Sequence, residues 1–115
     1  MFYKKSTNGY KEIIPGVELK TLTYGDKTLL SEFLIEQGNS LPKHHHPCEQ
    51  TGYLISGLML LTIGDKTFEV TPGDSWAIKS DVVHSTAAVK DSVVIEVFSP
   101  VREEYLPDNL VQRIE

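Results

Sequence analysis

The chain has 115 residues, a formal net charge of −5 at pH 7 and one cysteine. This length predicts a single domain, residues 1–115. The negative charge argues against nucleic acid as a partner, because no basic stripe is present to neutralise phosphates. No apolar run approaches the roughly 20 residues of a membrane helix, and the N-terminus lacks the apolar segment of a secretory signal. A single cysteine excludes an internal disulfide framework, so we expect a cytoplasmic protein without a membrane partner.

Taken in order, the sequence reads as short strands separated by glycine and proline turns. Alternating or continuously apolar segments predict strands at 17–24, 28–36, 53–56, 58–63, 66–70, 75–78, 82–84 and 92–98. Residues 1–16 are polar, residues 37–42 are expected to form a loop, and the tail beyond residue 99 has room for one helical turn around Arg102 to Tyr105. No helical periodicity is sustained, so the pattern predicts an all-β, antiparallel sandwich or barrel.

The segment from His44 to Gln50 is rich in side chains that bind metals. If it is extended, its side chains alternate between two faces. Neutral imidazole is the commonest protein ligand for divalent transition metals, and two histidines two residues apart on one strand face can hold the same ion. One face would carry His44, His46, Cys48 and Gln50, and the other His45 and Glu49.

His84 is the remaining histidine and follows another apolar segment. Folding can bring it to an ion held by His44 and His46. The run of histidines is also compatible with a solvated loop, and a single downstream histidine with a structural role, so the residues alone leave both interpretations open. Cys48 either approaches the metal or is a small buried side chain.

Five residues in this region are spaced as in the first motif of the cupin superfamily, which the region therefore resembles. Gly38, His44, His46 and Gly57 stand in register with that motif, and Gln50 stands where many members have Glu. The resemblance implies an antiparallel jelly-roll β-barrel, here with its core at about residues 17–99 and a short C-terminal tail.

The second cupin motif is matched more weakly. Gly64 opens it, Pro72 begins its turn, and His84 stands at its ligand position. Lys79 replaces the usual proline and Ala88 the frequent asparagine. Neither departure falls on a ligand position, so they bear on local geometry. Together the two motifs cover Gly38 to Ala88.

A closer resemblance is to the small pectin-degradation cupins, which open an unsaturated uronate ring to its linear keto form. It rests on the segment HHHPCEQTGYLISG and on the tail EVFSPVREEY. It implies one divalent transition metal ion (Zn, Ni, Mn, Fe or Co), a small anionic or polyhydroxylated substrate, and catalytic roles for Glu96, Phe98 and Arg102. That family typically has Asp at the position of Glu96. The metal ligands that it implies are His44, His46, Gln50 and His84.

The orientation of Glu96 decides whether it can act. If Val94, Glu96 and Phe98 face inward, burial raises the pKa of Glu96 and suits it to general acid–base work. In the alternative, Glu96 faces solvent and its apolar neighbours on the other face of the strand form the core. Arg102 either binds a substrate carboxylate or makes a surface ion pair with Glu103 or a partner chain.

Three classes of function remain open. The ligand set is neutral and would keep the full charge of the ion, which favours an anionic substrate and a metal-dependent, non-redox enzyme. A dioxygenase or oxalate-type cupin often uses a carboxylate ligand, which Gln50 does not supply. The third class is a non-catalytic module that binds a small ligand. The run of apolar residues around Met59 predicts a cover on both faces of its strand, and therefore a homodimer.

Overall fold

The computed structural model describes residues 2–107, which form an antiparallel jelly roll of eight strands. The predicted all-β fold is confirmed, and the expected helical turn is present as a short 3₁₀ helix, η1, at Glu103–Tyr105. Within residues 2–107, no helix has the length and apolar character needed to cross a membrane. The strands are β1 Lys11–Ile14, β2 Val17–Tyr24, β3 Leu29–Ile35, β4 Ser40–His44, β5 Glu49–Ile63, β6 Lys66–Val70, β7 Ser75–Ile78 and β8 His84–Ser99.

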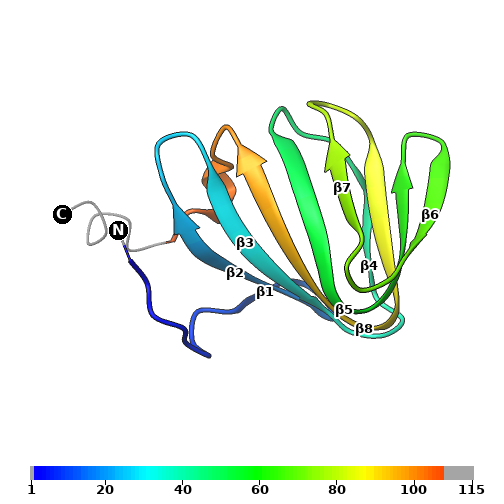
Figure 1. Ribbon diagram of the computed structural model, residues 1–115, viewed down its shortest axis with the longest axis horizontal. Coiled ribbons are helices and arrows are strands. Elements are labelled where there is room, and N and C mark those ends of the chain that lie inside the picture. Colours follow the sequence, from blue (N-terminus) through cyan, green and yellow to red (C-terminus); the bar gives the residue numbers. More distant parts are fainter. Residues whose placement is uncertain (1, 108–115) are drawn as a thin grey trace.

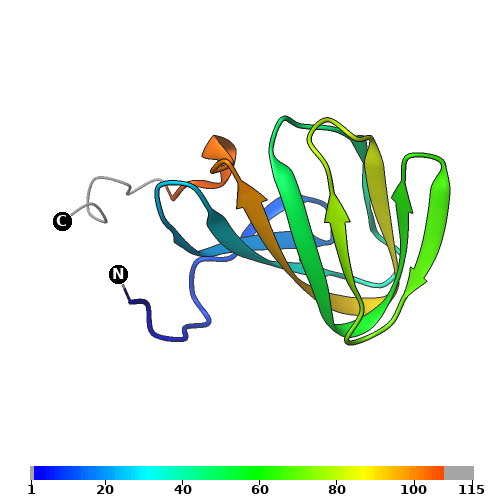
Figure 2. The same cartoon turned by 45° about the horizontal axis from the view of Figure 1, so that its top comes forward.

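The strands pair in the order β1-β2-β3-β8-β5-β6, and β4 and β7 pair with β8 and β5 (Figure 1). The two longest strands, β5 and β8, run antiparallel along each other from Glu49 opposite Ser99 to Ile63 opposite His84. The first half of β8 pairs with β4 and its second half with β3. β8 therefore bends as it passes around the barrel, and Figure 2 shows its yellow and orange halves running in different directions.

Gly57 lies inside β5, so the predicted break between two strands there is wrong. Its φ is +107°, and a β-carbon at this position would lie 2.3 Å from Ser92 Oγ and 2.5 Å from the backbone oxygen of Asp91. Only glycine fits, and the register shifts around it mark a bulge at which the strand bends. The strand predicted at 82–84 is wrong for its first two residues, which precede β8, and His84 and the segment predicted at 92–98 belong to one strand.

The single extended segment predicted for residues 44–50 is also not formed. β4 ends at His44 and β5 begins at Glu49, with a connection between them. Burial nevertheless alternates along this connection, since residues 46, 48 and 50 are buried and residues 45 and 49 are exposed. The expected loop at 37–42 contributes its last residues to β4, and β1 lies in the polar N-terminal region for which no strand is predicted.

The inner faces of the strands form the core. On β3, buried and half-buried residues alternate along the whole strand, as expected for a strand with one face on the core. Burying each large apolar side chain contributes roughly 1.5–3 kcal/mol. The same inner surface carries polar groups, which are costly to bury without partners. They are Ser31, His46, Gln50, His84, Ser92 and Glu96.

Candidate metal centre

Three of the four histidines meet inside the barrel. His44 on β4 lies directly opposite His84 on β8, and their ring centroids are 4.1 Å apart. His46 reaches the same place from the connection between β4 and β5, with its ring centroid 5.0 Å from that of His84. One ring nitrogen of each histidine lies within 4.8 Å of the others, a spacing that can hold a metal ion.

Backbone carbonyls orient all three rings. The Nδ1 atom of His44 lies 2.7 Å from the oxygen of Pro42, and the Nδ1 atoms of His46 and His84 lie 2.8 Å from the oxygens of Cys48 and Val82. A carbonyl only accepts, so each Nδ1 must carry the proton and donate it. Each Nε2 therefore has a free lone pair, and backbone bonds of this kind are typical of metal-binding histidines.

Gln50 adds a fourth acceptor to this group. Its Oε1 lies 2.7 Å from His46 Nε2, while its amide donates a hydrogen bond to Glu96 Oε2. With the amide in this orientation two lone pairs face each other, because His46 Nδ1 already carries the ring proton. Burial, and then the charge of Arg102, lower the pKa of His46, so protonation of the ring does not relieve the contact. A cation that both atoms coordinate would relieve the contact.

The environment of His84 fits the same ion. Burial lowers the pKa of His84 to about 4, so the ring is neutral at physiological pH. Its Nε2 is buried and has no hydrogen-bond partner within residues 2–107. An unpaired buried acceptor beside two others is the arrangement that a metal ion satisfies. The chemistry of the donor set therefore fits a divalent transition metal.

Glu96 faces inward, as the catalytic interpretation requires. Its side chain is 8% exposed, and Val94 and Phe98 on the same face are also buried. The alternative, in which Glu96 faces solvent, is wrong. Burial raises the pKa of Glu96 to about 8, although Arg102 and the hydrogen bond from Gln50 act against this shift. The carboxyl group is therefore mainly protonated at neutral pH in the metal-free protein.

Residues from distant parts of the chain close a small cavity over the histidines. The cavity is about 20 Å³ in volume, close to the space that one water molecule occupies. A straight β8 would place His84 and Glu96 about 40 Å apart, so the bend in the strand is what brings them to one site. The lining residues are Phe33, Leu41, His44, Gln50, His84, Thr86, Glu96, Phe98, Arg102 and Tyr105.

Tyr105 belongs to this wall, although no role is predicted for it. Its ring packs edge-on against Phe98 and Phe33, at centroid distances of 5.4 and 6.0 Å. Thr21 on β2 donates a hydrogen bond to the backbone oxygen of Tyr105 and so holds η1 against the barrel. The sequence does contain a signal for this position of Tyr105. Residues three apart lie on the same side of a 3₁₀ helix, so the helical turn predicted at Arg102 to Tyr105 places these two side chains together.

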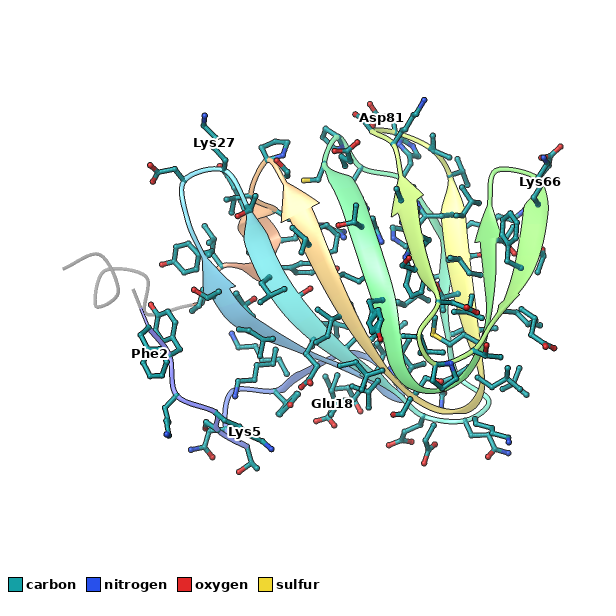
Figure 3. The ribbon with its side chains drawn as sticks, viewed as in Figure 1. Phe2, Lys5, Glu18, Lys27, Lys66 and Asp81 are labelled. Atoms are coloured by element: carbon teal, nitrogen blue, oxygen red, sulfur yellow. The ribbon has the colours of Figure 1, made fainter. Side chains whose placement is uncertain are left out.

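The remaining candidates lie outside the cluster. His45 and Glu49 point away from His46 and Gln50, as predicted, and both are exposed. His45 Nδ1 lies 3.6 Å from Oδ1 of Asp81, which is on the connection between β7 and β8 and is labelled in Figure 3. Cys48 is buried in the core and is not a member of the histidine cluster. Its thiol pKa is raised by burial, so it remains protonated, and its backbone oxygen orients His46.

Comparison with protein families and solved structures supports the fold. The cupin domain family matches residues 31–99. KdgF from Halomonas sp. superimposes with a TM-score of 0.87 at 23% identity, over 92% of this chain and 100% of that one. An RmlC-like cupin from Shewanella frigidimarina NCIMB 400 gives a TM-score of 0.87 at 21% identity, over 91% and 95% of the two chains.

A third structure superimposes less closely. The polyketide cyclase RemF from Streptomyces resistomycificus gives a TM-score of 0.74 at 24% identity, over 97% of this chain and 92% of that one. Comparison with curated proteins finds no significant match. At these identities the solved structures establish a shared fold, and the chemistry must be argued from the site itself.

Proposed function

The chain belongs to the cupin family, and from that premise we propose that it is a metal-dependent enzyme that converts an unsaturated uronate to its linear keto form. The observation that carries the proposal is a cluster of three imidazole nitrogens beside one cavity, whose lining includes two of these histidines, the Gln50 amide and a buried carboxyl group. Structural similarity to KdgF from Halomonas sp. and the motif resemblance to the pectin-degradation cupins agree with it.

We assign the metal to His44, His46, His84 and Gln50, all of them neutral ligands. When bound, the ion supplies Lewis-acid polarisation of substrate oxygen atoms. Because no ligand cancels its charge, the site favours a substrate with a carboxylate and adjacent oxygens. Such a donor set accepts Zn, Ni, Mn, Fe or Co. The absence of a carboxylate ligand disfavours the oxalate-type and dioxygenase alternatives.

The proposed reaction is an isomerisation, so it needs one proton to leave the substrate and one to enter it. Glu96 donates its proton to the carbon of the ring double bond that does not carry the ring oxygen, and the π electrons form the new C–H bond. The bond between the ring oxygen and the anomeric carbon breaks, and the anomeric hydroxyl returns its proton to Glu96. Burial keeps this acid protonated before the reaction. Arg102 binds the substrate carboxylate through paired N–H groups, and the Phe98 ring packs against the sugar.

The direct test is turnover of an unsaturated uronate. Protein loaded separately with Zn, Ni, Mn, Fe or Co is expected to remove the absorbance of the conjugated enol ether. Chelation of the metal should stop the reaction and its return should restore it. A matched saturated uronate, without the double bond, serves as the blank. Binding without turnover for every metal would contradict the proposal and support the non-catalytic module.

We also propose that two copies associate through the outer face of β5. Tyr53 and Ile55 on this face are 46% and 49% exposed, and Tyr53 lies next to Ile95 on β8. An apolar outer face of this kind is typical of an interface between subunits. Light scattering is expected to give twice the 12.9 kDa chain mass, and Ile55→Lys the single mass. A single chain mass for the unaltered protein would contradict the proposed association.

The cytoplasmic location stays a prediction.

A further inference from the structure

We propose that the carboxylate of Glu104 competes with the carboxylate of the ligand for Arg102. In the ligand-free protein it is the counter-ion of Arg102, and an incoming carboxylate displaces it. The inference rests on the proposed function only in placing Arg102 beside the bound anion. It deepens that function by identifying a residue that sets the affinity of the site for acids.

The position of Arg102 supports this role. Its side chain is 14% exposed and lines the cavity together with His44, Gln50 and His84. The guanidinium carbon lies 4.3 Å from the centre of the Tyr105 ring and 5.4 Å from that of Phe98. These cation–π contacts hold the charge at the wall of the cavity without using any of its N–H groups. Arg102 therefore presents donors for an acid at the site.

The contact between Arg102 and Glu104 is easily exchanged. Glu104 Oε2 lies 3.1 Å from Arg102 Nε, but the Glu104 side chain is 62% exposed. The same Nε is buried and makes no hydrogen bond within residues 2–107, so the carboxylate lies away from the N–H direction. An exposed ion pair of this kind contributes little stability, and a carboxylate aligned with Nε–H gains a charge-assisted hydrogen bond that Glu104 does not make to this atom.

Entry of a ligand also requires this contact to change. The cavity holds about 20 Å³, far less than a sugar acid needs. Arg102 and Tyr105 form one wall, on a turn of three residues that follows β8. One hydrogen bond from Thr21 to the backbone oxygen of Tyr105 ties this turn to β2, whereas strand pairing and backbone hydrogen bonds fix the histidines and Glu96. The wall that moves is therefore the one that contains Arg102, with which Glu104 pairs. Displacement of Glu104 then frees Arg102 for the ligand.

The test compares two single-charge changes on the same turn. Metal-loaded protein is titrated with D-galacturonate, and with D-galactose as the neutral probe, by calorimetry. Glu104→Gln is expected to tighten galacturonate binding by about three- to fivefold, the range of an exposed ion pair. Glu103→Gln is the matched control, because Glu103 is exposed and makes no ion pair within the described residues. It should change the affinity less than twofold, and neither variant should alter galactose binding.

The Arg102→Gln background separates the pair from a general charge effect. There, Glu104→Gln should no longer strengthen galacturonate binding. Equal affinities of the unaltered protein and Glu104→Gln, an equal gain from Glu103→Gln, or no binding to either protein would each overturn the inference. Failure of the proposed function has a different signature, because lack of turnover of the unsaturated uronate leaves the affinity difference intact.

Discussion

Substitution of His84 by alanine is expected to weaken metal binding by about a hundredfold or more. Loss of a residue that merely orients a ligand already costs about 10- to 100-fold, and His84 would supply a ligand atom itself. Its Nε2 is buried without a hydrogen-bond partner among residues 2–107, and its ring is fixed opposite His44 by the pairing of β4 with β8. Metal content after dialysis against a chelator, measured by atomic emission, gives the result.

The matched control for this experiment is His45→Ala. His45 stands in the same run of histidines, but its side chain is exposed and lies beside Asp81. It should keep one equivalent of metal with the affinity of the unaltered protein. Circular dichroism checks that both variants are folded. If His84→Ala retained metal as tightly as His45→Ala, the proposed ligand set would be wrong.

The second large effect is expected for Glu96→Gln, which should lower kcat by about 10²- to 10⁴-fold, the usual contribution of a general acid–base group. Glutamine has nearly the same shape and preserves the packing around Phe98, but it cannot exchange the proton. The metal ligands are unchanged, so metal content should stay at one equivalent. Steady-state kinetics on the unsaturated uronate, with metal analysis of the same samples, separates the two properties.

Glu96→Asp is the conservative companion to this substitution. It keeps the carboxyl group but moves its oxygens by about one ångström, so part of the activity should return relative to Glu96→Gln. A purely structural role predicts the opposite order, because the shorter side chain leaves a cavity that glutamine fills. Full activity of Glu96→Gln with metal retained would exclude Glu96 as the proton donor.

Short strands with clear turns at both ends could be predicted to the residue. β2, β6 and β7 have the predicted bounds, because Pro15-Gly16, Gly64-Asp65 and Pro72-Gly73 punctuate the chain around them. The long strands could not be predicted, since Gly57 has the local signature of a strand end. Its role as a bulge depends on the approach of Asp91 and Ser92, which lie far away in the sequence.

The histidine cluster could be predicted because alternating burial survives the break between β4 and β5. His44, His46 and His84 come together, and Glu96 faces inward as one of the two interpretations required. Tyr105 and Glu104 could not be predicted in the same way. The spacing places Tyr105 on the same side of the turn as Arg102, but it does not specify the contact between the tail and β2 that brings this turn to the cavity.

The bend in β8 separates two groups of site residues along one strand. The half that pairs with β4 carries His84, and the half that pairs with β3 carries Glu96 and Phe98. A substitution in the half with Glu96 and Phe98 can therefore arise without changing the half that carries the proposed metal ligand His84. Inserting one residue at the bend would have the opposite effect, since every side chain beyond it would change face and the acid would be turned outward. The number of residues at the bend is thus constrained, while the side chains on either side of it can be substituted.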